Sequence, residues 1–278
     1  MRMLKSPISL CTTKLNMYFD DSILSSGSGF FYEYLGRHFL VTNRHNLTGR
    51  HQDSGAPLSP TAGIPNRLIF ETPTITGVGP SMTVGAAKSV YDLKWPEHDK
   101  PWREHPTLGE RADVVAIDLQ RLWPESPSPQ FCANSLPDSQ PLMLLPSSRV
   151  SVVGYPFGKS VAEHYPVWVT GSIASEPDFD ADGKPAIYVD CRTNRGSSGS
   201  PVFLMVIGSS APVDSDPVGK SAIMRARFGE GTEFVTFSTV VHRFIGIYSG
   251  RVDANADIGL VWRHQVIEDV CSAGVKPN

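Results

Sequence analysis

The sequence predicts an all-β fold, a sandwich or a barrel, and three observations support this prediction. The 24 glycines and 23 prolines are spread along all 278 residues and divide the chain into short pieces. These pieces are rich in β-branched and aromatic residues and have the length of strands. Long stretches with helical periodicity are scarce. The clearest strand candidates are RHFLVT (37–42), RVSVVGY (149–155), YPVWVTGSIA (165–174), AIYVDC (186–191), EFVTFSTVV (233–241) and RFIGIYSG (243–250).

One short amphipathic helix is predicted near the C-terminus, in VWRHQVIEDVCSAG. Its apolar residues recur at helical spacing, and a glycine at 274 lies past the expected end. We expect this helix to pack its apolar face on the body of the protein. The residues of that face are Trp262, Val266, Ile267, Val270 and Cys271.

Two long segments, residues 48–66 and 121–148, are predicted to be surface loops because of their turn-forming residues. The density of proline and serine in 121–148 is typical of a linker. It divides the chain into halves of similar size, which predicts an N-terminal unit over 1–130 and a C-terminal unit over 131–278. A third segment, 208–233, is expected to be irregular and to interrupt the second half.

Composition favours a packed globular protein, with 40% hydrophobic and 19% charged residues and a formal charge of −3. No basic run suggests nucleic-acid binding, and no run of 18 apolar residues suggests a membrane span. The N-terminus has no apolar region of signal-peptide length, so we expect a cytoplasmic protein. The four cysteines are widely spaced and form no zinc pattern with the histidines, so we expect reduced thiols, no metal and no cofactor.

The segment TNRGSSGSPVF (193–203) raises the question of a catalytic serine. A serine hydroxyl is a weak nucleophile and needs a base, an acid that orients the base and an oxyanion hole. His45 directly follows an apolar strand, and Asp113 opens another. With Ser198, these residues run in the order histidine, aspartate, serine, which matches chymotrypsin and neither the α/β-hydrolases nor subtilisin.

Other residues compete for these roles. Asp118 is a rival for Asp113 but lies deeper in its strand, and Ser197 and Ser200 flank Ser198 with side chains expected to point elsewhere. Cys191 is interpreted as a strand residue that packs in the interior. We therefore take Ser198, His45 and Asp113 as the candidates.

With these motifs, the sequence resembles the trypsin/chymotrypsin-fold serine peptidases, in particular the bacterial trypsin-like and high-temperature-requirement branch. LVTNRH is similar to the family's histidine motif, ADVVAI to its aspartate motif and NRGSSGSP to its nucleophile loop. Supporting matches are VVGYPFG, VTGSIAS and FIGIYSG, so the resemblance covers roughly residues 25–262. It implies two six-stranded antiparallel β-barrels, chymotrypsin-like, with the first carrying the histidine and aspartate and the second carrying the serine, and with the site in the cleft between them.

The resemblance also implies a role for each residue. His45 is the general base and then the general acid, Asp113 orients the imidazole, and Ser198 is the nucleophile. The backbone N–H groups of Gly196 and Ser198 form the oxyanion hole. The substrate pairs with the strand Gly246, Ile247, Tyr248 and Ser249. The pocket for the residue before the scissile bond is walled by this strand and by the segment from Arg192 to Asn194.

Departures from the family pattern bear on specificity and compartment. Asn46 and Asn194 stand where digestive relatives have cysteines, which agrees with an intracellular protein without disulfides. Arg192 stands where an acid would select basic substrates, so that specificity loses its usual support. An Arg192 that lines the pocket would favour acidic substrates, whereas we favour an Arg192 that is salt-bridged or faces solvent.

The sequence therefore predicts a serine endopeptidase that acts on proteins or peptides. The alternatives are a catalytically silent binding module of the same fold and an enzyme held inactive until a protein partner binds. In the last case, the loop 48–66 or the segment 208–233 would face the partner. No nucleic acid or membrane partner is expected.

Overall fold

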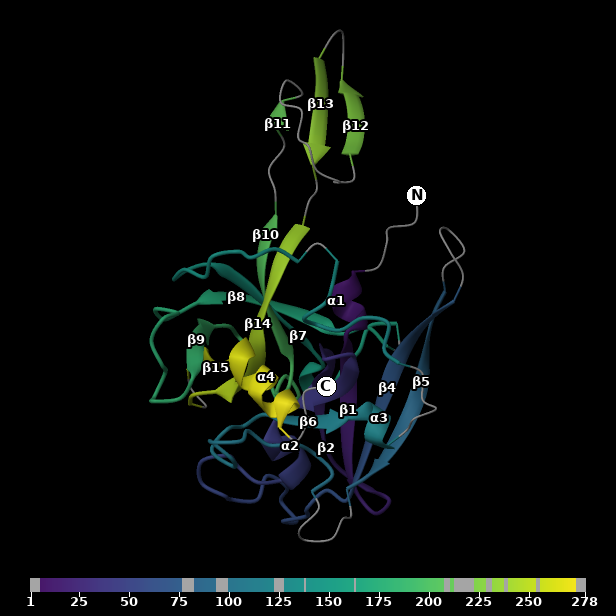
Figure 1. Ribbon diagram of the computed structural model, residues 1–278, viewed down its shortest axis with the longest axis vertical. Coiled ribbons are helices and arrows are strands. Elements are labelled where there is room, and N and C mark those ends of the chain that lie inside the picture. Colours follow the sequence, from purple (N-terminus) through teal and green to yellow (C-terminus); the bar gives the residue numbers. More distant parts are fainter. Residues whose placement is uncertain are drawn as a thin grey trace.

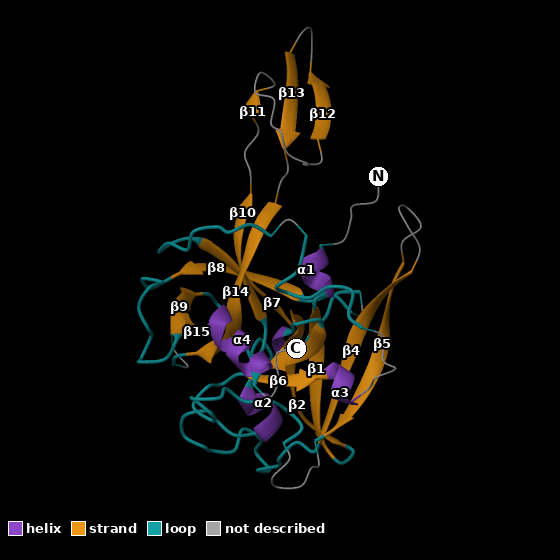
Figure 2. Cartoon of the chain, viewed as in Figure 1, coloured by secondary structure: helices purple, strands orange, loops and turns teal. Residues whose placement is uncertain are grey.

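The computed structural model describes residues 6–273 except for 77–82, 94–99, 123–127, 138, 163, 208–210, 213–222, 229–231, 238–239 and 254–255. Strands dominate, and the helices are short (Figure 2). Gly274, predicted to follow the last helix, lies outside the described residues.

The first half of the chain forms one six-stranded antiparallel sheet with the strand order β5-β4-β1-β2-β3-β6 (Figure 1). Its elements are α1 (Pro7–Leu10), β1 (Thr12–Phe19), β2 (Ser22–Tyr34), β3 (Arg37–Thr42), α2 (Arg44–Thr48), β4 (Arg67–Thr76), β5 (Thr83–Asp92), β6 (Val115–Asp118) and α3 (Leu119–Leu122).

A first barrel was expected here, but in the described residues the sheet does not close. β6 has only four residues, and its outer edge is already occupied by Arg103, which exchanges two backbone hydrogen bonds with Ala116 (2.8 and 3.2 Å). Because Arg103 occupies this edge, β5 does not pair with β6. Among the described strands β5 pairs only with β4, over their full ten residues.

The second half forms a closed six-stranded barrel in the order β10-β14-β15-β9-β8-β7, which confirms that part of the prediction. The barrel and the elements around it are β7 (Arg149–Gly154), the 3₁₀ turn η2 (Pro156–Gly158), β8 (Val167–Ile173), β9 (Ala186–Asp190), β10 (Pro201–Ile207), β14 (Val240–Arg251), β15 (Ile258–Arg263) and α4 (His264–Ser272).

Between β10 and β14 the segment predicted to be irregular instead contains a small antiparallel sheet, drawn at the top of Figure 1. Its strands are β11 (Ala211–Pro212), β12 (Ile223–Phe228) and β13 (Thr232–Phe237). The single strand expected over 233–241 is accordingly divided between β13 and β14. The run TEFVTF is rich in residues that favour strands, and IMRARF pairs with it residue for residue from Ile223↔Phe237 to Phe228↔Thr232.

The C-terminal helix is confirmed as α4, whose Val266, Ile267, Val270 and Cys271 are buried. Trp262, expected on the same helical face, belongs instead to β15, directly before the helix. α4 packs against β14 and β15 of the barrel and against β2 and β6 of the first sheet. One hydrophobic core thus joins the two halves, with Phe30 from the first and Phe203 from the second.

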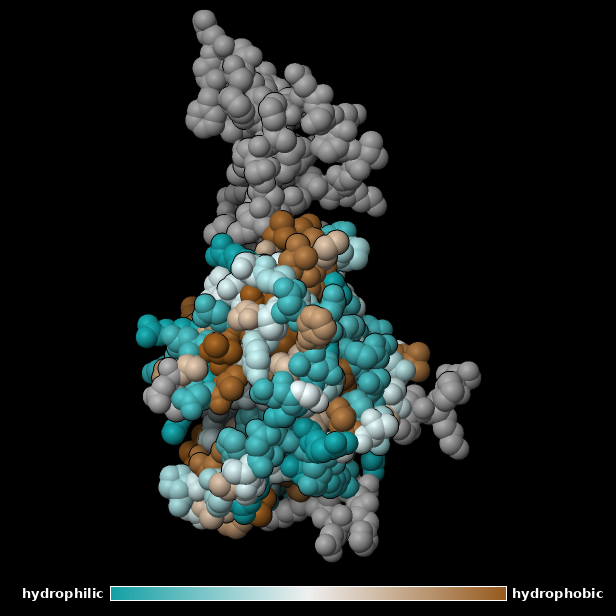
Figure 3. Space-filling model, turned by 90° about the vertical axis from the view of Figure 1, so that its left-hand side faces the viewer, coloured by the Kyte–Doolittle hydropathy of each residue, from teal (hydrophilic) through white to brown (hydrophobic). Residues whose placement is uncertain are grey.

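The surface in Figure 3 is mostly hydrophilic, with hydrophobic side chains in separate small groups. Across the part of the chain that the structure describes, no helix is both long and apolar enough to span a membrane.

Candidate active site

His45 lies in the first turn of α2, immediately beyond the end of β3. Asn43 keeps an extended backbone (φ −76°, ψ 146°) and separates the strand from the helix. Its side chain does not cap α2; the Asn43 amide Nδ2 donates instead to the backbone oxygen of Asp113 (2.7 Å). This buried bond fixes the turn that carries His45 to the turn that carries Asp113.

Asp113 precedes β6, and the pairing of Thr42 with Val115 places it beside the start of α2. Its carboxylate is almost completely buried, with 1% exposed. Oδ1 accepts the backbone N–H of His45 (3.0 Å), and Oδ2 lies 2.7 Å from His45 Nδ1. Because a carboxylate only accepts, Nδ1 carries the proton, and Nε2 of a neutral imidazole is then an acceptor. Asp113 thus fixes both the orientation and the tautomer of His45.

Ser249, at a register shift of β14, also donates its hydroxyl hydrogen to Asp113 Oδ2. The sequence placed Ser249 in the substrate strand but did not predict this contact. The backbone oxygen of the same residue lies 3.4 Å from Ser198 Oγ and accepts its hydrogen. Ser249 therefore contacts both the candidate acid and the candidate nucleophile.

Ser198 lies in the loop before β10, in the position that faces the cleft. Ser197 and Ser200 are buried, and neither lines the cleft, whereas Ser198 does. The Ser198 hydroxyl donates to Ser249, and among the described residues no hydrogen bond joins it to His45. The structure thus brings His45, Asp113 and Ser198 to one cleft, with the serine side chain turned toward β14.

The backbone around Gly196 leaves two N–H groups without an acceptor among the described residues. The oxygen of Arg195 accepts the N–H of Phe157 in the turn η2. In a trans peptide the C=O and N–H point in opposite directions, so the N–H of Gly196 points away from η2. In the described part of the chain, neither this N–H nor that of Ser198 has an acceptor.

Gly196 is required here for two reasons. Its φ of +91° is in the region that glycine favours, and an added Cβ would lie 2.5 Å from the oxygen of Tyr155. The nucleophile loop can therefore approach η2 only with glycine at this position.

A set of buried polar residues connects this loop to the first sheet, and the sequence singled out only Asn46 among them, for the absence of a cysteine. Ser28 on β2 donates its hydroxyl to the oxygen of Gly196 (2.7 Å), and its N–H donates to the oxygen of Ser198 (2.9 Å). Asn46 on α2 also donates to the oxygen of Ser198 (3.3 Å), and Thr42 donates to the oxygen of Ser28 (2.8 Å). The only sequence signal for Ser28 is the GSG triplet at 27–29.

The cleft has a volume of about 390 Å³. Lys184 and Asp53 meet across it at 2.9 Å, so the loop 48–66 and the second half of the chain are in contact there. The residues that line it are His45, His51, Gln52, Asp53, Leu58, Asp113, Asp182, Lys184, Ser198, Ser249, Gly250, Arg251, Val252, Leu260 and Trp262.

Of the predicted substrate residues, the structure places only Ser249 on the cleft. The Arg192 side chain is 87% exposed, lies 3.7 Å from Asp257 and does not line the cleft, in agreement with the favoured interpretation. Asn194 is exposed, whereas Ile247 and Tyr248 are buried.

The backbone pairing of β14 explains why its contact with the cleft begins at Ser249, later in the strand than predicted. Gly246 and Ile247 pair with β10 on one side and β15 on the other, and Tyr248 bonds to the nucleophile loop. An open edge for an extended peptide starts only at Ser249. Gly250 and Arg251, which the sequence did not predict, continue that edge along the cleft.

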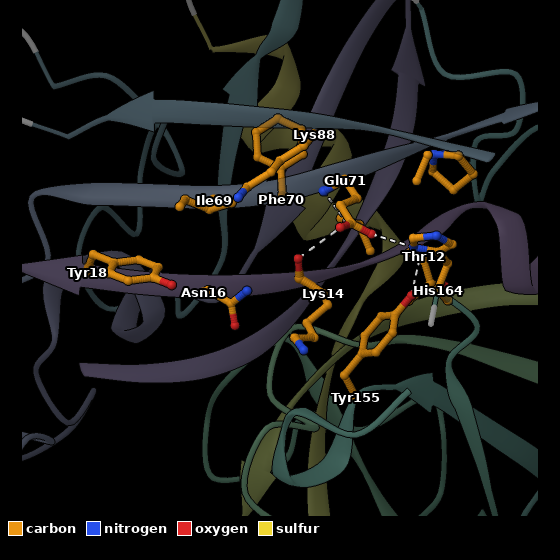
Figure 4. Close-up of a pocket in the computed structure, with 13 residues that line it drawn as sticks. Thr12, Lys14, Asn16, Tyr18, Ile69, Phe70, Glu71, Lys88, Tyr155 and His164 are labelled. Carbon is orange, nitrogen blue, oxygen red and sulfur yellow. Dashed lines mark hydrogen bonds and ion pairs between the residues drawn. The ribbon is translucent and has the colours of Figure 1, made fainter. Parts of the chain in front are cut away.

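A second, smaller hollow of about 140 Å³ lies on the face of β1, β4 and β5 (Figure 4). There Glu71 Oε2 lies 2.7 Å from His164 Nδ1, and the Tyr155 hydroxyl donates to the oxygen of His164 (2.8 Å). No serine or cysteine is among the residues that line this hollow. Its contacts hold the segment after β7, including η2, against the first sheet.

All four cysteines are free and buried. Burial raises the pKa of the Cys191 thiol to about 11 and that of Cys132 to about 12. A thiol with so high a pKa is a poor nucleophile at neutral pH, in agreement with Cys191 as an interior residue. Within the described residues, no cluster of three or more histidine, cysteine or acidic side chains could hold a metal ion.

Several solved structures match this chain at low sequence identity. A serine endoprotease from Yersinia pestis matches with a TM-score of 0.50 and 10% identity, over 98% of this chain and 67% of that one. A protease from M. tuberculosis in its active form has a TM-score of 0.46 and 12% identity, covering 97% and 83%. A thermostable serine protease, AL20, from an extremophilic microorganism has a TM-score of 0.46 and 13% identity, covering 97% and 100%.

No curated protein matches the chain at a significant level. The model of one protein family does match, over residues 27–208, which is more than half of the chain and includes His45, Asp113 and Ser198. The chain thus belongs to the family of trypsin-like peptidase domains.

Proposed function

We propose that this protein is a serine endopeptidase that cleaves peptide bonds through Ser198, His45 and Asp113. One observation carries the proposal: the buried Asp113 orients His45 at 2.7 Å in the same cleft that exposes Ser198. Membership of a peptidase family supports protein or peptide substrates.

In the proposed reaction, a rotation of the Ser198 side chain moves its hydroxyl from Ser249 to His45 Nε2. His45 takes the proton while Oγ attacks the scissile carbonyl carbon, and Asp113 stabilises the imidazolium. The carbonyl oxygen becomes negative and accepts hydrogen bonds from the N–H groups of Gly196 and Ser198.

The tetrahedral intermediate then collapses. His45 donates the proton to the leaving amine, the carbon–nitrogen bond breaks, and an acyl ester remains on Ser198. A water molecule then hydrolyses the acyl ester. His45 takes one proton from the water, and the water oxygen bonds to the acyl carbon. His45 returns the proton to Ser198 Oγ as the bond between Oγ and the acyl carbon breaks and the acid leaves.

A fluorophosphonate that carries a fluorophore tests this proposal, because it bonds covalently to an activated serine. We expect labelling of the wild type and none of the Ser198→Ala variant, with hydrolysis of casein following the same pattern. Absence of labelling in folded wild-type protein would contradict constitutive activity. Labelling of the Ser198→Ala variant at the wild-type level would contradict the assignment of Ser198.

An enzyme gated by a partner is the second candidate, and the orientation of Ser198 favours it. The hydroxyl bonds to Ser249 rather than His45, so the resting site is not yet aligned for attack. His51, Gln52 and Asp53 of the loop 48–66 line the cleft, where a partner would contact both the loop and the site. Labelling that appears only after addition of a partner protein would support gating, and labelling of the isolated protein would oppose it.

A further inference from the structure

The side chain of Tyr248 is buried between β14 and the segment that precedes Ser198. Only 1% of this residue is exposed, and its hydroxyl forms a hydrogen bond with the hydroxyl of Thr193, which is itself buried. The Tyr248 backbone bonds to the other end of the same loop, donating to Ser200 and accepting from Gly199 (both 2.9 Å). The tyrosine therefore holds these two segments together.

The far side of the ring is closed by β15. A Cβ added at Gly259 would lie 2.3 Å from Tyr248 Cε2, so the ring lies directly against the glycine backbone. Buried Cys191 and Val261 belong to the same core cluster. The ring is thus enclosed by the barrel core.

The position of Ser198 indicates where a substrate side chain would have to go. In the proposed reaction the scissile carbonyl carbon would lie next to Ser198 Oγ, and an extended peptide that pairs with β14 from Ser249 onward would approach from one side. The side chain before the scissile bond would then insert between β14 and residues 192–197. That space is where Tyr248 and Thr193 meet.

The residues that line the cleft agree with a space that Tyr248 and Thr193 already fill. Its lining includes Ser249, Gly250 and Arg251, but neither Thr193 nor Tyr248, nor any other residue of 191–197. The cavity therefore extends from Ser198 along β14 and does not continue between the two segments.

We propose that Tyr248 determines specificity by filling this pocket, so that the protein cleaves after small side chains such as glycine, alanine or serine. This inference rests on the proposed peptidase function. The groups that close the pocket are neutral, and Arg192 faces solvent beside Asp257. Long, aromatic and charged side chains before the scissile bond are accordingly excluded.

The test uses peptides that differ only in the residue before the scissile bond: alanine, leucine, phenylalanine or lysine. For the wild type we expect kcat/KM for alanine to exceed that for phenylalanine by about tenfold or more, since a filled hydrophobic pocket rejects added bulk. Tyr248→Ala opens the space and should raise the ratio of kcat/KM for the phenylalanine peptide to kcat/KM for the alanine peptide by about tenfold or more. Tyr248→Phe keeps the ring and should keep the wild-type ratio.

The ratio separates this role from a merely structural one, because general damage would lower kcat/KM for all four peptides equally. If Tyr248→Ala does not fold, Tyr248→Leu removes less volume and should shift preference toward leucine. Equal wild-type cleavage after alanine and phenylalanine would overturn the proposal, as would an unchanged ratio in a folded Tyr248→Ala or Tyr248→Leu variant.

Labelling with the fluorophosphonate distinguishes a failure of the role proposed for Tyr248 from a failure of the proposed peptidase function. A wild type that is labelled but shows no preference for small residues refutes the role of Tyr248 and leaves the peptidase function standing. A folded wild type that is neither labelled nor active on any peptide refutes both.

Discussion

The hydroxyl of Ser28 donates a hydrogen bond to the backbone oxygen of Gly196 at 2.7 Å and joins the first sheet to the nucleophile loop. The two residues are 168 positions apart. The same hydroxyl oxygen accepts the N–H of Tyr155 (2.9 Å), next to η2. Ser28 therefore supports the peptide geometry on which the proposed oxyanion hole depends.

Replacing Ser28 by alanine should impair both stability and turnover. The substitution removes this partner from the oxygen of Gly196 and from the buried N–H of Tyr155, at a cost of about 1–3 kcal/mol in the free energy of unfolding. We expect kcat/KM to fall about tenfold, because the Gly196 peptide is less firmly held. Urea unfolding and peptide hydrolysis measure the two effects.

Ser25→Ala is the matched control, since Ser25 lies exposed on the same strand. It should change neither quantity. A Ser28→Ala variant with wild-type kcat/KM would show that the oxyanion geometry does not depend on Ser28.

Asp113, which precedes β6, and Asp118, the last residue of β6, should respond differently to replacement by asparagine. Asp113→Asn presents an amide to His45 and disturbs the tautomer, so kcat should fall by about 10⁴ while the protein stays folded. Asp118 is buried and bonds to Arg37 (2.7 Å) and Arg103 (2.6 Å). Both arginines are partly exposed and water can solvate them, so Asp118→Asn should reduce stability by about 1–3 kcal/mol and leave kcat nearly unchanged in the folded fraction.

Thermal unfolding and steady-state kinetics on both variants decide between these expectations. A larger loss of kcat in Asp118→Asn than in Asp113→Asn would exchange the roles that we assign.

The strands and the relation of His45 to Asp113 could be predicted because they depend on local patterns. RHFLVT forms β3 at its predicted limits, because a run of apolar, β-branched and aromatic residues bounded by turn residues strongly favours a strand. Asp113 reaches His45 through the pairing of β3 with β6, whose ends both lie next to the motifs. Short motifs at strand ends thus carry information about distant contacts.

The remaining features depend on contacts that no local pattern encodes. Tyr248 looked like one residue of a substrate strand, and only the fold brings Gly259 and Thr193 to its ring. Closure of the first sheet depends on whether Arg103 or β5 occupies the edge of β6. The displacement of the open edge to Ser249 depends on where β10 stops pairing with β14.

Replacing Gly196 by alanine should abolish most activity. The new Cβ would meet the oxygen of Tyr155 at 2.5 Å and the nitrogen of Phe157 at 3.0 Å, so the peptide must move. Loss of one oxyanion donor lowers kcat by about 10²–10³. The rate of fluorophosphonate labelling should fall by a similar factor.

Gly183→Ala is the control that separates the effect of backbone strain from the effect of the contact between an added Cβ and Tyr155. Gly183 also has a positive φ (+65°), but nothing lies within 4 Å of an added Cβ. We expect a modest loss of stability and a normal rate of labelling. Equal labelling by Gly196→Ala and the wild type would mean that the Gly196 N–H does not stabilise the reacting oxygen.

His264, the first residue of α4, should make the stability of the protein depend on pH. Burial lowers the pKa of its imidazole, with a smaller contribution from Arg243 and an opposing one from Glu268. The Tyr32 hydroxyl forms a hydrogen bond with Nε2 (2.6 Å), and the rings of Tyr32 and Phe244 pack against the imidazole. These contacts keep the ring away from the water that would solvate its charged form.

A histidine whose pKa is lower in the folded state binds fewer protons there than in the unfolded chain. Between the two values, each step down in pH therefore favours unfolding. Stability should be independent of His264 above the unfolded value of about 6.5 and decrease as the pH falls below it. In His264→Gln, the melting temperature should depend less steeply on pH below this value, whereas exposed His51→Gln should follow the wild type. An identical pH dependence of the melting temperature in His264→Gln and the wild type would show that His264 is not protonated on unfolding in this range.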